Sequence, residues 1–129
     1  PGSTLLNIST RGEVNVDPNA LIGGFFVGGT ESKTIVVRAI GPSLSALGVS
    51  GALADPTLEF FNGQGTKLDE NNDWETSANK AQIQNSGLAP SNMKESAVLQ
   101  TLAAGPYTAV VRGTNSGTGI GSVEVYQLP

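Results

Sequence analysis

The 129-residue sequence predicts an all-β domain: a two-sheet antiparallel β-sandwich, jelly-roll-like, with eight or nine strands and one short helix. Seventeen glycines and seven prolines interrupt the chain at short intervals, as many sharp turns require. Apolar residues alternate with smaller or polar ones, as strands with one buried face require. The clearest alternation is at Val98, Leu102, Tyr107, Ala109 and Val111. The length fits one domain, so residues 1–129 are expected to share one core.

The expected strands are short apolar runs that end at turn residues. They cover residues 4–9, 20–27, 33–40, 57–62, 66–70 and 120–128, with two more inside 95–113. Within the second run, Gly23-Gly24 indicates a bulge or a close backbone approach. After the third run, a helical turn over 43–47 is expected, with Ser43 as its N-cap and Gly48 as its stop.

In the second half of the chain, two hairpins and a helix are expected. The Asn62-Gly63-Gln64-Gly65 turn predicts that the two runs beside it pair as a hairpin. Asp73 is expected to cap a short helix over 75–85, which Gly87 would end. A second hairpin is expected around Ala104-Gly105-Pro106.

Composition excludes several functions. The sequence has no His and no Cys, so it cannot form a Ser-His-Asp triad, a Cys-His dyad, a disulfide or a zinc site built on those ligands. Seven cationic residues are scattered through a chain of net charge −4, so neither nucleic acid nor an anionic membrane surface is an expected partner. No apolar run approaches the roughly 20 residues of a membrane span, so membrane insertion is not expected.

Two resemblances to known families follow from short motifs. Leu58-Glu59-Phe60-Phe61-Asn62-Gly63-Gln64-Gly65, Asn71-Asn72-Asp73 and Gly105-Pro106-Tyr107-Thr108 resemble the bacterial pre-peptidase C-terminal domain, over about residues 55–128. That resemblance implies a jelly-roll sandwich appended to a secreted enzyme.

The second resemblance spans the whole chain. The chain resembles a β-sandwich repeat domain, which is found in tandem or at the C-terminus of very large secreted surface proteins of environmental bacteria. It implies an extracellular, non-catalytic role and defines no ligand. The motifs that carry it are Leu6-Asn7-Ile8-Ser9-Thr10-Arg11-Gly12, Leu21-Ile22-Gly23-Gly24-Phe25, Val37-Arg38-Ala39-Ile40-Gly41-Pro42-Ser43-Leu44, Ala54-Asp55-Pro56-Thr57-Leu58, Gly87-Leu88-Ala89-Pro90 and Val123-Glu124-Val125-Tyr126.

One dense group of oxygen-bearing side chains offers a metal site. Asp69, Asn71 and Asp73 would supply the oxygen ligands that Ca²⁺ prefers, with Asp55 and Glu95 as further ligands. The alternative is a solvated hairpin exit with Asp73 as a helix cap, which is favoured because Asx residues cap and turn by themselves. No other cofactor is expected.

Three further side chains are singled out by type and position. Trp74 is a candidate for stacking on a glycan, and the alternative is a hydrophobic plug where the helix meets the sandwich, which is favoured. Arg38 and Arg112 lie in strands, where charge is unusual. They are expected to pair with Asp55, Glu95 or Glu124 and to lock loops to the sheet.

The function that these observations favour is a non-catalytic structural or adhesive module, secreted and displayed at the cell surface. Copies of the chain would form a filament or array by strand addition or end-to-end packing, either as units of a covalent tandem repeat or as separate subunits that exchange the first strand. Leu5, Leu6 and Ile8 are the residues of this strand expected to carry the assembly, with their alternating neighbours in pockets of an acceptor sheet. The chain begins at Pro1 rather than Met, which fits a processed or excised segment.

Two other functions stay open at this point. One is a carbohydrate- or calcium-binding accessory domain of a secreted protein. The other, a hydrolase that uses a pair of carboxylates, is less favoured because the sequence does not indicate which of its eleven acidic residues would pair.

Overall fold

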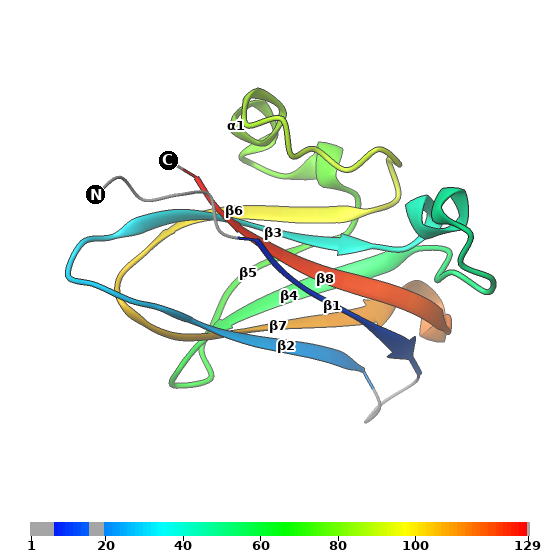
Figure 1. The fold of residues 1–129 in the computed structure, drawn as a ribbon, viewed down its shortest axis with the longest axis horizontal. Coiled ribbons are helices and arrows are strands. Elements are labelled where there is room, and N and C mark those ends of the chain that lie inside the picture. Colours follow the sequence, from blue (N-terminus) through cyan, green and yellow to red (C-terminus); the bar gives the residue numbers. More distant parts are fainter. Residues whose placement is uncertain (1–6, 16–19, 129) are drawn as a thin grey trace.

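The computed structural model describes residues 7–15 and 20–128, which form eight strands in two antiparallel sheets packed face to face (Figure 1). The predicted β-sandwich is therefore confirmed. Sheet A has the order β1-β8-β3-β6, and sheet B has the order β2-β7-β4-β5. Sheet A consists of β1 (Asn7–Val14), β8 (Gly119–Gln127), β3 (Lys33–Ile40) and β6 (Ser96–Leu102). Sheet B consists of β2 (Leu21–Val27), β7 (Gly105–Gly113), β4 (Pro56–Asn62) and β5 (Lys67–Asn71).

The connections between strands have the jelly-roll pattern. Every consecutive pair of strands lies in different sheets except β4 and β5, which form the hairpin predicted from the Asn62-Gly63-Gln64-Gly65 turn. The hairpin predicted around Ala104-Gly105-Pro106 is wrong, because β6 pairs with β3 while β7 pairs with β2 and β4. The local sequence specifies that the chain reverses there. It does not specify whether the returning strand joins the same sheet or the opposite one.

The core lies between the sheets and is built from alternate residues of each strand. Val98, Leu102, Tyr107, Ala109 and Val111, whose alternation predicted a buried face, are all buried in one cluster. Three stacked rings, Phe25, Phe60 and Tyr107, join β2, β4 and β7 with centroids 5.7–5.9 Å apart. Burying each large apolar side chain contributes roughly 1.5–3 kcal/mol, so this cluster dominates the stability of the sandwich.

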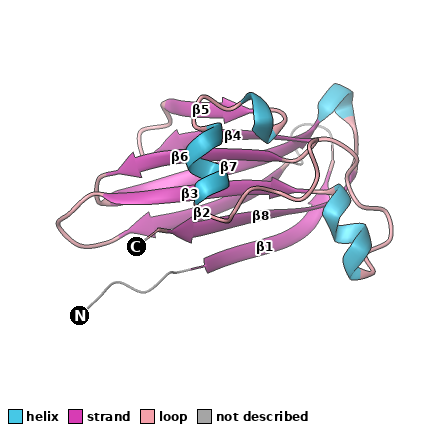
Figure 2. Cartoon of the chain, turned by 90° about the horizontal axis from the view of Figure 1, so that it is seen from above, coloured by secondary structure: helices cyan, strands magenta, loops and turns pink. Residues whose placement is uncertain are grey.

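The segment between β5 and β6, residues 72–95, covers the outer face of sheet A (Figure 2). It contains a 3₁₀ turn, η2 (Trp74–Thr76), and a short helix, α1 (Lys80–Asn85). The single helix predicted over 75–85 is therefore divided. Asp73 makes no capping hydrogen bond and has a φ of 82°, so its predicted role as a cap is wrong. Gly87, with a φ of 79°, follows the helix end as predicted.

Three local predictions have different outcomes. The close backbone approach expected at Gly23-Gly24 is observed, since a Cβ at Gly23 would lie 2.7 Å from Val123 Cγ1. The helical turn after β3 is a 3₁₀ helix, η1 (Pro42–Leu47), and Gly48 ends it with a φ of 88°. Ser43 does not cap it, because its hydroxyl donates to the buried Glu95 carboxylate.

The first strand continues further along the sequence than predicted. β1 covers Asn7–Val14, so it includes residues 7–9 of the predicted strand and extends five residues beyond them, and all eight of its residues pair with β8. Among the assembly residues named from the sequence, Ile8 lies within β1, and Leu5 and Leu6 lie outside the described residues.

Candidate functional site: the open seam between β1 and β2

The sandwich has two long sides, and each is formed by one edge strand from each sheet. On one side β1 of sheet A lies opposite β2 of sheet B, and on the other side β6 lies opposite β5. Figure 2 shows β1 and β5 at opposite sides of the molecule. An edge strand leaves a row of backbone N–H and C=O groups without strand partners, so it can accept a further strand unless something covers it.

Side chains close the side formed by β5 and β6, which we call the sealed seam. The amide oxygen of the buried Asn71 accepts a 3.0 Å hydrogen bond from the backbone N–H of Ala97 in β6. The side-chain amide of Asn79 donates to the carbonyl of Leu99, at 2.9 Å. Edge groups of β6 thus have hydrogen-bond partners from β5 and from residues 72–95, which we call the covering segment. No further strand can reach them without displacing those side chains.

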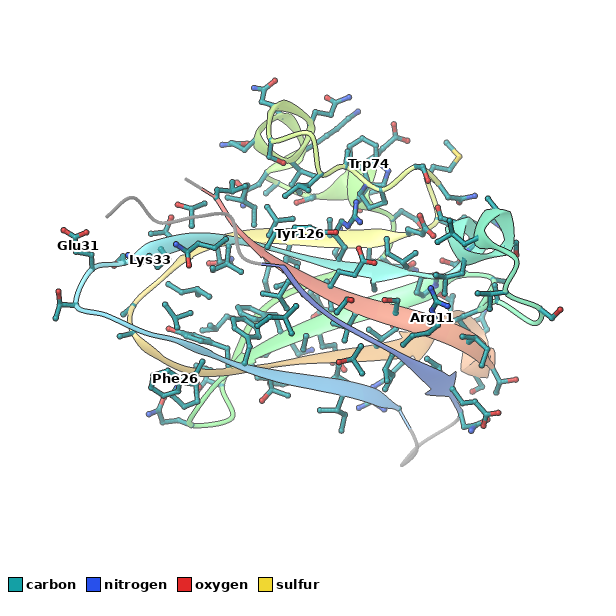
Figure 3. All side chains as sticks on the ribbon, in the orientation of Figure 1. Arg11, Phe26, Glu31, Lys33, Trp74 and Tyr126 are labelled. Carbon is teal, nitrogen blue, oxygen red and sulfur yellow. The ribbon has the colours of Figure 1, made fainter. Side chains whose placement is uncertain are left out.

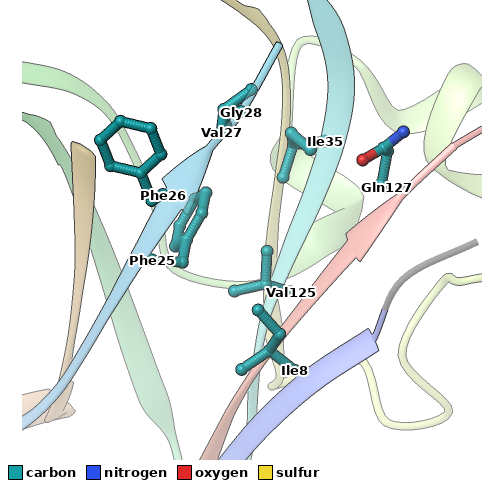
Figure 4. A pocket seen from close by; sticks show the side chains of 8 residues that line it. All are labelled: Ile8, Phe25, Phe26, Val27, Gly28, Ile35, Val125 and Gln127. Carbon is teal, nitrogen blue, oxygen red and sulfur yellow. The ribbon is translucent and has the colours of Figure 1, made fainter. Parts of the chain in front are cut away.

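The β2 edge has none of these protections within the part of the chain that the structure describes. Its sequence, LIGGFFV, carries no charged residue, whereas β1 contains Arg11 and Glu13 and β5 contains Lys67, Asp69 and Glu70. Ile22 is 58% exposed and Phe26 is 71% exposed, and the Phe26 ring lies on the opposite side of β2 from Phe25 (Figures 3 and 4). Charged residues on edge strands are a common protection against unwanted pairing, so their absence from β2 leaves this edge able to accept a strand.

The seam between β1 and β2, which we call the open seam, is narrow at one end and wide at the other. Near the connection from β1 to β2 the sheets are close, since a Cβ at Gly12 would lie 3.2 Å from Leu21 Cδ1. At the opposite end, the side chains leave a pocket of about 70 Å³ (Figure 4). A single water needs about 10–15 Å³ on this measure, so the pocket can hold an aliphatic side chain.

The lining of this pocket is almost entirely apolar. Buried side chains of Val27, Ile35 and Val125 form part of it, and Ile8, 50% exposed, contributes from β1. The remaining lining residues are Phe25, Phe26, Gly28 and Gln127. The Gln127 amide is the one polar side chain among the eight, so the pocket favours an apolar occupant.

The sequence prediction did not single out β2. It named the first strand as the element that is donated, and it assigned no such role to β2. Residues 20–27 are uncharged and apolar on both faces of a strand, whereas a strand with one solvated face alternates between apolar and polar. A strand buried on both faces has the same pattern, so the sequence alone does not show that Ile22 and Phe26 face outward.

Three of the predicted calcium ligands, Asp69, Asn71 and Glu95, hydrogen-bond to other parts of the chain. Asp69 accepts hydrogen bonds from the Gln100 side chain and the Glu70 backbone, and the side-chain oxygen of Asn71 accepts one from the backbone N–H of Ala97. Glu95, named as a further ligand, is fully buried and accepts hydrogen bonds from the backbone N–H groups of Gly41 and Ser43. Within residues 7–15 and 20–128, no three acidic side chains converge to hold a metal ion.

Asp55 and Asp73 differ from the other acids. Each has a buried Oδ1 that lacks a hydrogen-bond partner in the structure as described. Burial raises the pKa of Asp55, and the negative charge of Asp73 raises that pKa further, while Lys94 and a hydrogen bond from Thr114 act in the opposite direction. Two carboxylates that repel each other disfavour the charged form.

Trp74 lies inside the covering segment rather than on the surface. Its side chain is 7% exposed and packs with Ile83 and Ala97, with Ala89 and Leu99 around them (Figure 3). The indole thus occupies the position of the hydrophobic plug, and in this conformation it offers almost no face to a ligand.

The two strand arginines have different surroundings. Arg38 forms an ion pair with Glu124, stacks over the Tyr126 ring with 5.0 Å from Cζ to the centroid, and donates to the Leu88 carbonyl. It therefore ties the covering segment to sheet A. Burial raises the pKa of Tyr126, and Arg38 opposes that shift. Arg112 pairs with Glu59 at 3.1 Å, a partner that was not among the three predicted from the sequence.

Comparison with known proteins gives a similarity of fold. No family model matches the chain, and no curated protein matches it. Among solved structures, the chain is similar to the pre-peptidase C-terminal domain of a collagenase from Bacillus anthracis, with 13% identity and a TM-score of 0.56 over 93% of this chain and 89% of that one. It also aligns with a structure of Bacillus endospore appendages, described as disulfide-linked pili, with 11% identity and a TM-score of 0.37 over 98% and 90% of the two chains.

The first of these similarities shows a shared β-sandwich fold, and the second is too weak to support a structural comparison. The sequence resemblance to the pre-peptidase C-terminal domain is thus matched at the level of the fold, and the resemblance to a tandem repeat domain stays a prediction. No helix in the described ranges is long and apolar enough to cross a bilayer.

Proposed function

We propose that the chain is a non-catalytic structural module of a bacterial extracellular assembly, and that copies of it associate by strand addition at the open seam. The observation that carries this proposal is the contrast between the two sides of the sandwich. On one side, the side chains of Asn71 and Asn79 hydrogen-bond to backbone groups at the edge of β6. On the other, β2 is an uncharged apolar edge with Ile22 and Phe26 exposed.

Strand addition suits the energetics of this edge. An added strand would satisfy the backbone groups of β2 and would also remove exposed apolar side chains from water. Burying Ile22 and Phe26 fully would contribute roughly 1.5–3 kcal/mol each. Association costs roughly 4–15 kcal/mol in lost translational and rotational freedom. Burial of these two side chains offsets a cost at the low end of this range, and the new backbone hydrogen bonds must contribute the rest.

Several observations support a role without catalysis. The sequence lacks His and Cys, and the buried acid Glu95 is used to hold backbone N–H groups in place. A C-terminal domain of a collagenase has the same fold, which suits a module that accompanies other domains in a secreted or surface-displayed protein.

Sedimentation velocity and electron microscopy test the assembly directly. We expect the wild-type chain to form concentration-dependent polymers, and a chain lacking residues 1–6 to stay monomeric. Because β1 begins at Asn7, this truncation leaves every β1–β8 pair intact, whereas removal of residues 1–9 would also cut the strand. A wild-type chain that remains monomeric at all concentrations would contradict the proposal. Polymers from the truncated chain would contradict the role of the first residues as the donated strand.

Mass measurement under denaturing conditions separates the two forms of assembly. Separate subunits joined by strand exchange give polypeptides that each contain one copy of this 13.2 kDa domain. A covalent tandem array gives multiples of that mass.

A second candidate function is a calcium- or carbohydrate-binding accessory domain, and the unpartnered oxygens of Asp55 and Asp73 favour its calcium-binding form. Carboxylate and backbone carbonyl oxygens are the ligands that Ca²⁺ prefers, and the two aspartates supply the carboxylates. Calorimetric titration with calcium chloride, repeated on Asp73→Asn, tests it. Binding heat in the wild type that disappears in the variant supports calcium binding at these residues. The absence of binding heat in both proteins would contradict calcium binding. A glycan panel tests the carbohydrate part.

A further inference from the structure

Resting on the proposed self-assembly, we infer where the added strand binds and which residues it uses. The structure assigns β2 as the acceptor strand, and assigns the pocket between Phe25, Ile35 and Val125 as the receptor for one leucine of residues 4–6 from a second copy. The other leucine of the pair Leu5-Leu6 would lie on the outer surface, against Ile22 and Phe26.

The distribution of apolar residues in β2 supports this assignment. Leu21, Phe25 and Val27 face the core, and Ile22 and Phe26 face outward, so β2 is apolar on both of its faces. A strand that pairs with it therefore meets apolar neighbours on both faces. Consecutive residues of a strand point to opposite faces, so an adjacent pair of leucines would place one side chain in the pocket and one beside Ile22 and Phe26.

The length of residues 1–6 also fits. Residues 1–6 precede Asn7, and six extended residues span at most about 20 Å. The acceptor strand β2 has seven residues, so the two lengths are similar. Neither residues 1–6 nor β2 contains a charged side chain, so pairing them buries no unpaired charge on a side chain.

Topology favours a second copy over the same molecule as the donor. Residue Asn7 pairs with Tyr126, almost at the end of β8, so chain that continues in the direction of β1 leads past the end of its own sheet. To bring Leu5 and Leu6 to its own β2, the chain would have to reverse between these residues and Asn7, and a tight turn takes about four residues. A second copy can supply the two leucines without such a reversal.

Two blocked variants of the full chain test the assignment. Phe26→Lys places a charge on the acceptor edge at a side chain that is 71% exposed, so the fold should not change. A chain with both Leu5→Lys and Leu6→Lys blocks the donor. We expect each variant alone to sediment as a monomer, with self-association weakened by about 100-fold or more. Mixed in equal amounts, they should form a one-to-one dimer, because each retains the half that the other lacks.

Matched controls exclude a general effect of added positive charge. Leu47→Lys changes an equally exposed apolar residue, in η1, that does not line the open seam, and it should assemble like the wild type. Gly28→Phe tests the pocket itself, since its Cβ would meet no atom within 4 Å and its ring can occupy the opening. It should cause loss of assembly without a new charge. Thermal unfolding verifies that each variant folds, and Ile22→Lys replaces Phe26→Lys if that variant does not.

The outcomes separate this inference from the proposed function. A wild-type chain that never self-associates contradicts both. Wild-type polymers together with normal polymers from Phe26→Lys and Gly28→Phe overturn the acceptor assignment and leave self-assembly intact. A mixture of the two blocked variants that remains monomeric overturns pairing between copies, including the case in which residues 1–6 occupy the β2 edge of their own chain.

Discussion

The two seams of this sandwich show that the composition of an edge strand does not decide whether the strand is protected. β6 (SAVLQTL) and β2 (LIGGFFV) are both uncharged edge strands at the margin of a four-stranded sheet. Asn71 and Asn79 bind edge groups of β6, and the covering segment lies over it. Within the described residues, no such segment covers β2. Protection of an edge depends on residues elsewhere in the chain, so it must be judged from the fold.

The largest expected effect concerns the covering segment. Trp74→Ala should lower the free energy of unfolding by about 3–5 kcal/mol, because it removes a large buried side chain from the small cluster with Ile83 and Ala97. Chemical denaturation measures the loss, with Met93→Ala, at an exposed site in the same segment, as a control that should change little. Unchanged stability in Trp74→Ala would show that the sealed seam does not depend on this plug and would reopen its role in ligand stacking.

The next prediction opens the sealed seam. Asn71→Ala should cost about 1–3 kcal/mol, because the N–H of Ala97 loses its partner in a buried position. The variant should also aggregate more readily than the wild type, since the β6 edge would resemble that of β2. Denaturation and light scattering measure the two effects. A stable variant that does not aggregate would mean that Asn71 is not what protects this edge.

The two strand arginines give a smaller, internal comparison. Arg38→Ala should cost about 1.5 kcal/mol or more, because it removes hydrogen bonds to Glu124 and to the covering segment at a largely buried site. Arg112→Ala should cost at most about 1 kcal/mol, since its pair with Glu59 is more exposed. Thermal unfolding of both variants tests this order. Unchanged stability in both would refute the idea that these arginines lock loops to the sheet.

The smallest expected effect depends on pH. The pKa of Asp55 is raised in the folded state by burial and by Asp73, so the folded state binds the proton more tightly than the unfolded state. Ionisation of Asp55 therefore lowers the free energy of unfolding as the pH rises from its unfolded pKa of 3.8 through the higher folded pKa. Asp55→Asn should unfold at a slightly higher temperature than the wild type at neutral pH.

The control for this prediction is the pH profile itself. The advantage of Asp55→Asn over the wild type should shrink as the pH falls and vanish below about 3.8. An advantage that stays constant with pH, or a loss of stability at neutral pH, would contradict the origin proposed for the shift.

Much of the fold could be predicted from the sequence, because local patterns specify local structure. Alternation at Val98 and Leu102 identified a buried face, and Gly48 and Gly87 marked helix ends. Longer-range pairing could not be predicted in the same way. The turn at Ala104-Gly105 is compatible with a hairpin and with a crossover between sheets, and the choice depends on distant strands.

The candidate site was only partly predictable for the same reason. Ile8 was named from the apolar character of the first strand, and it lines the pocket. Asn71 and Asp69 hydrogen-bond to Ala97 and Gln100 of β6, which lies far along the chain, and no local sequence pattern indicates these partners. Whether β2 lies at an edge is fixed by the order of strands in the sheet, and no local pattern contains that information.

Amide hydrogen exchange in dispersed and polymerised samples tests the central claim most directly, since it reports the two edges in one experiment. The account predicts that amides of β2 facing away from β7 exchange quickly in dispersed molecules and become strongly protected in the polymer, while the amide of Ala97 in β6 is protected in both. Protection in the polymer that appears on β5 or β6 and leaves β2 unchanged would contradict it.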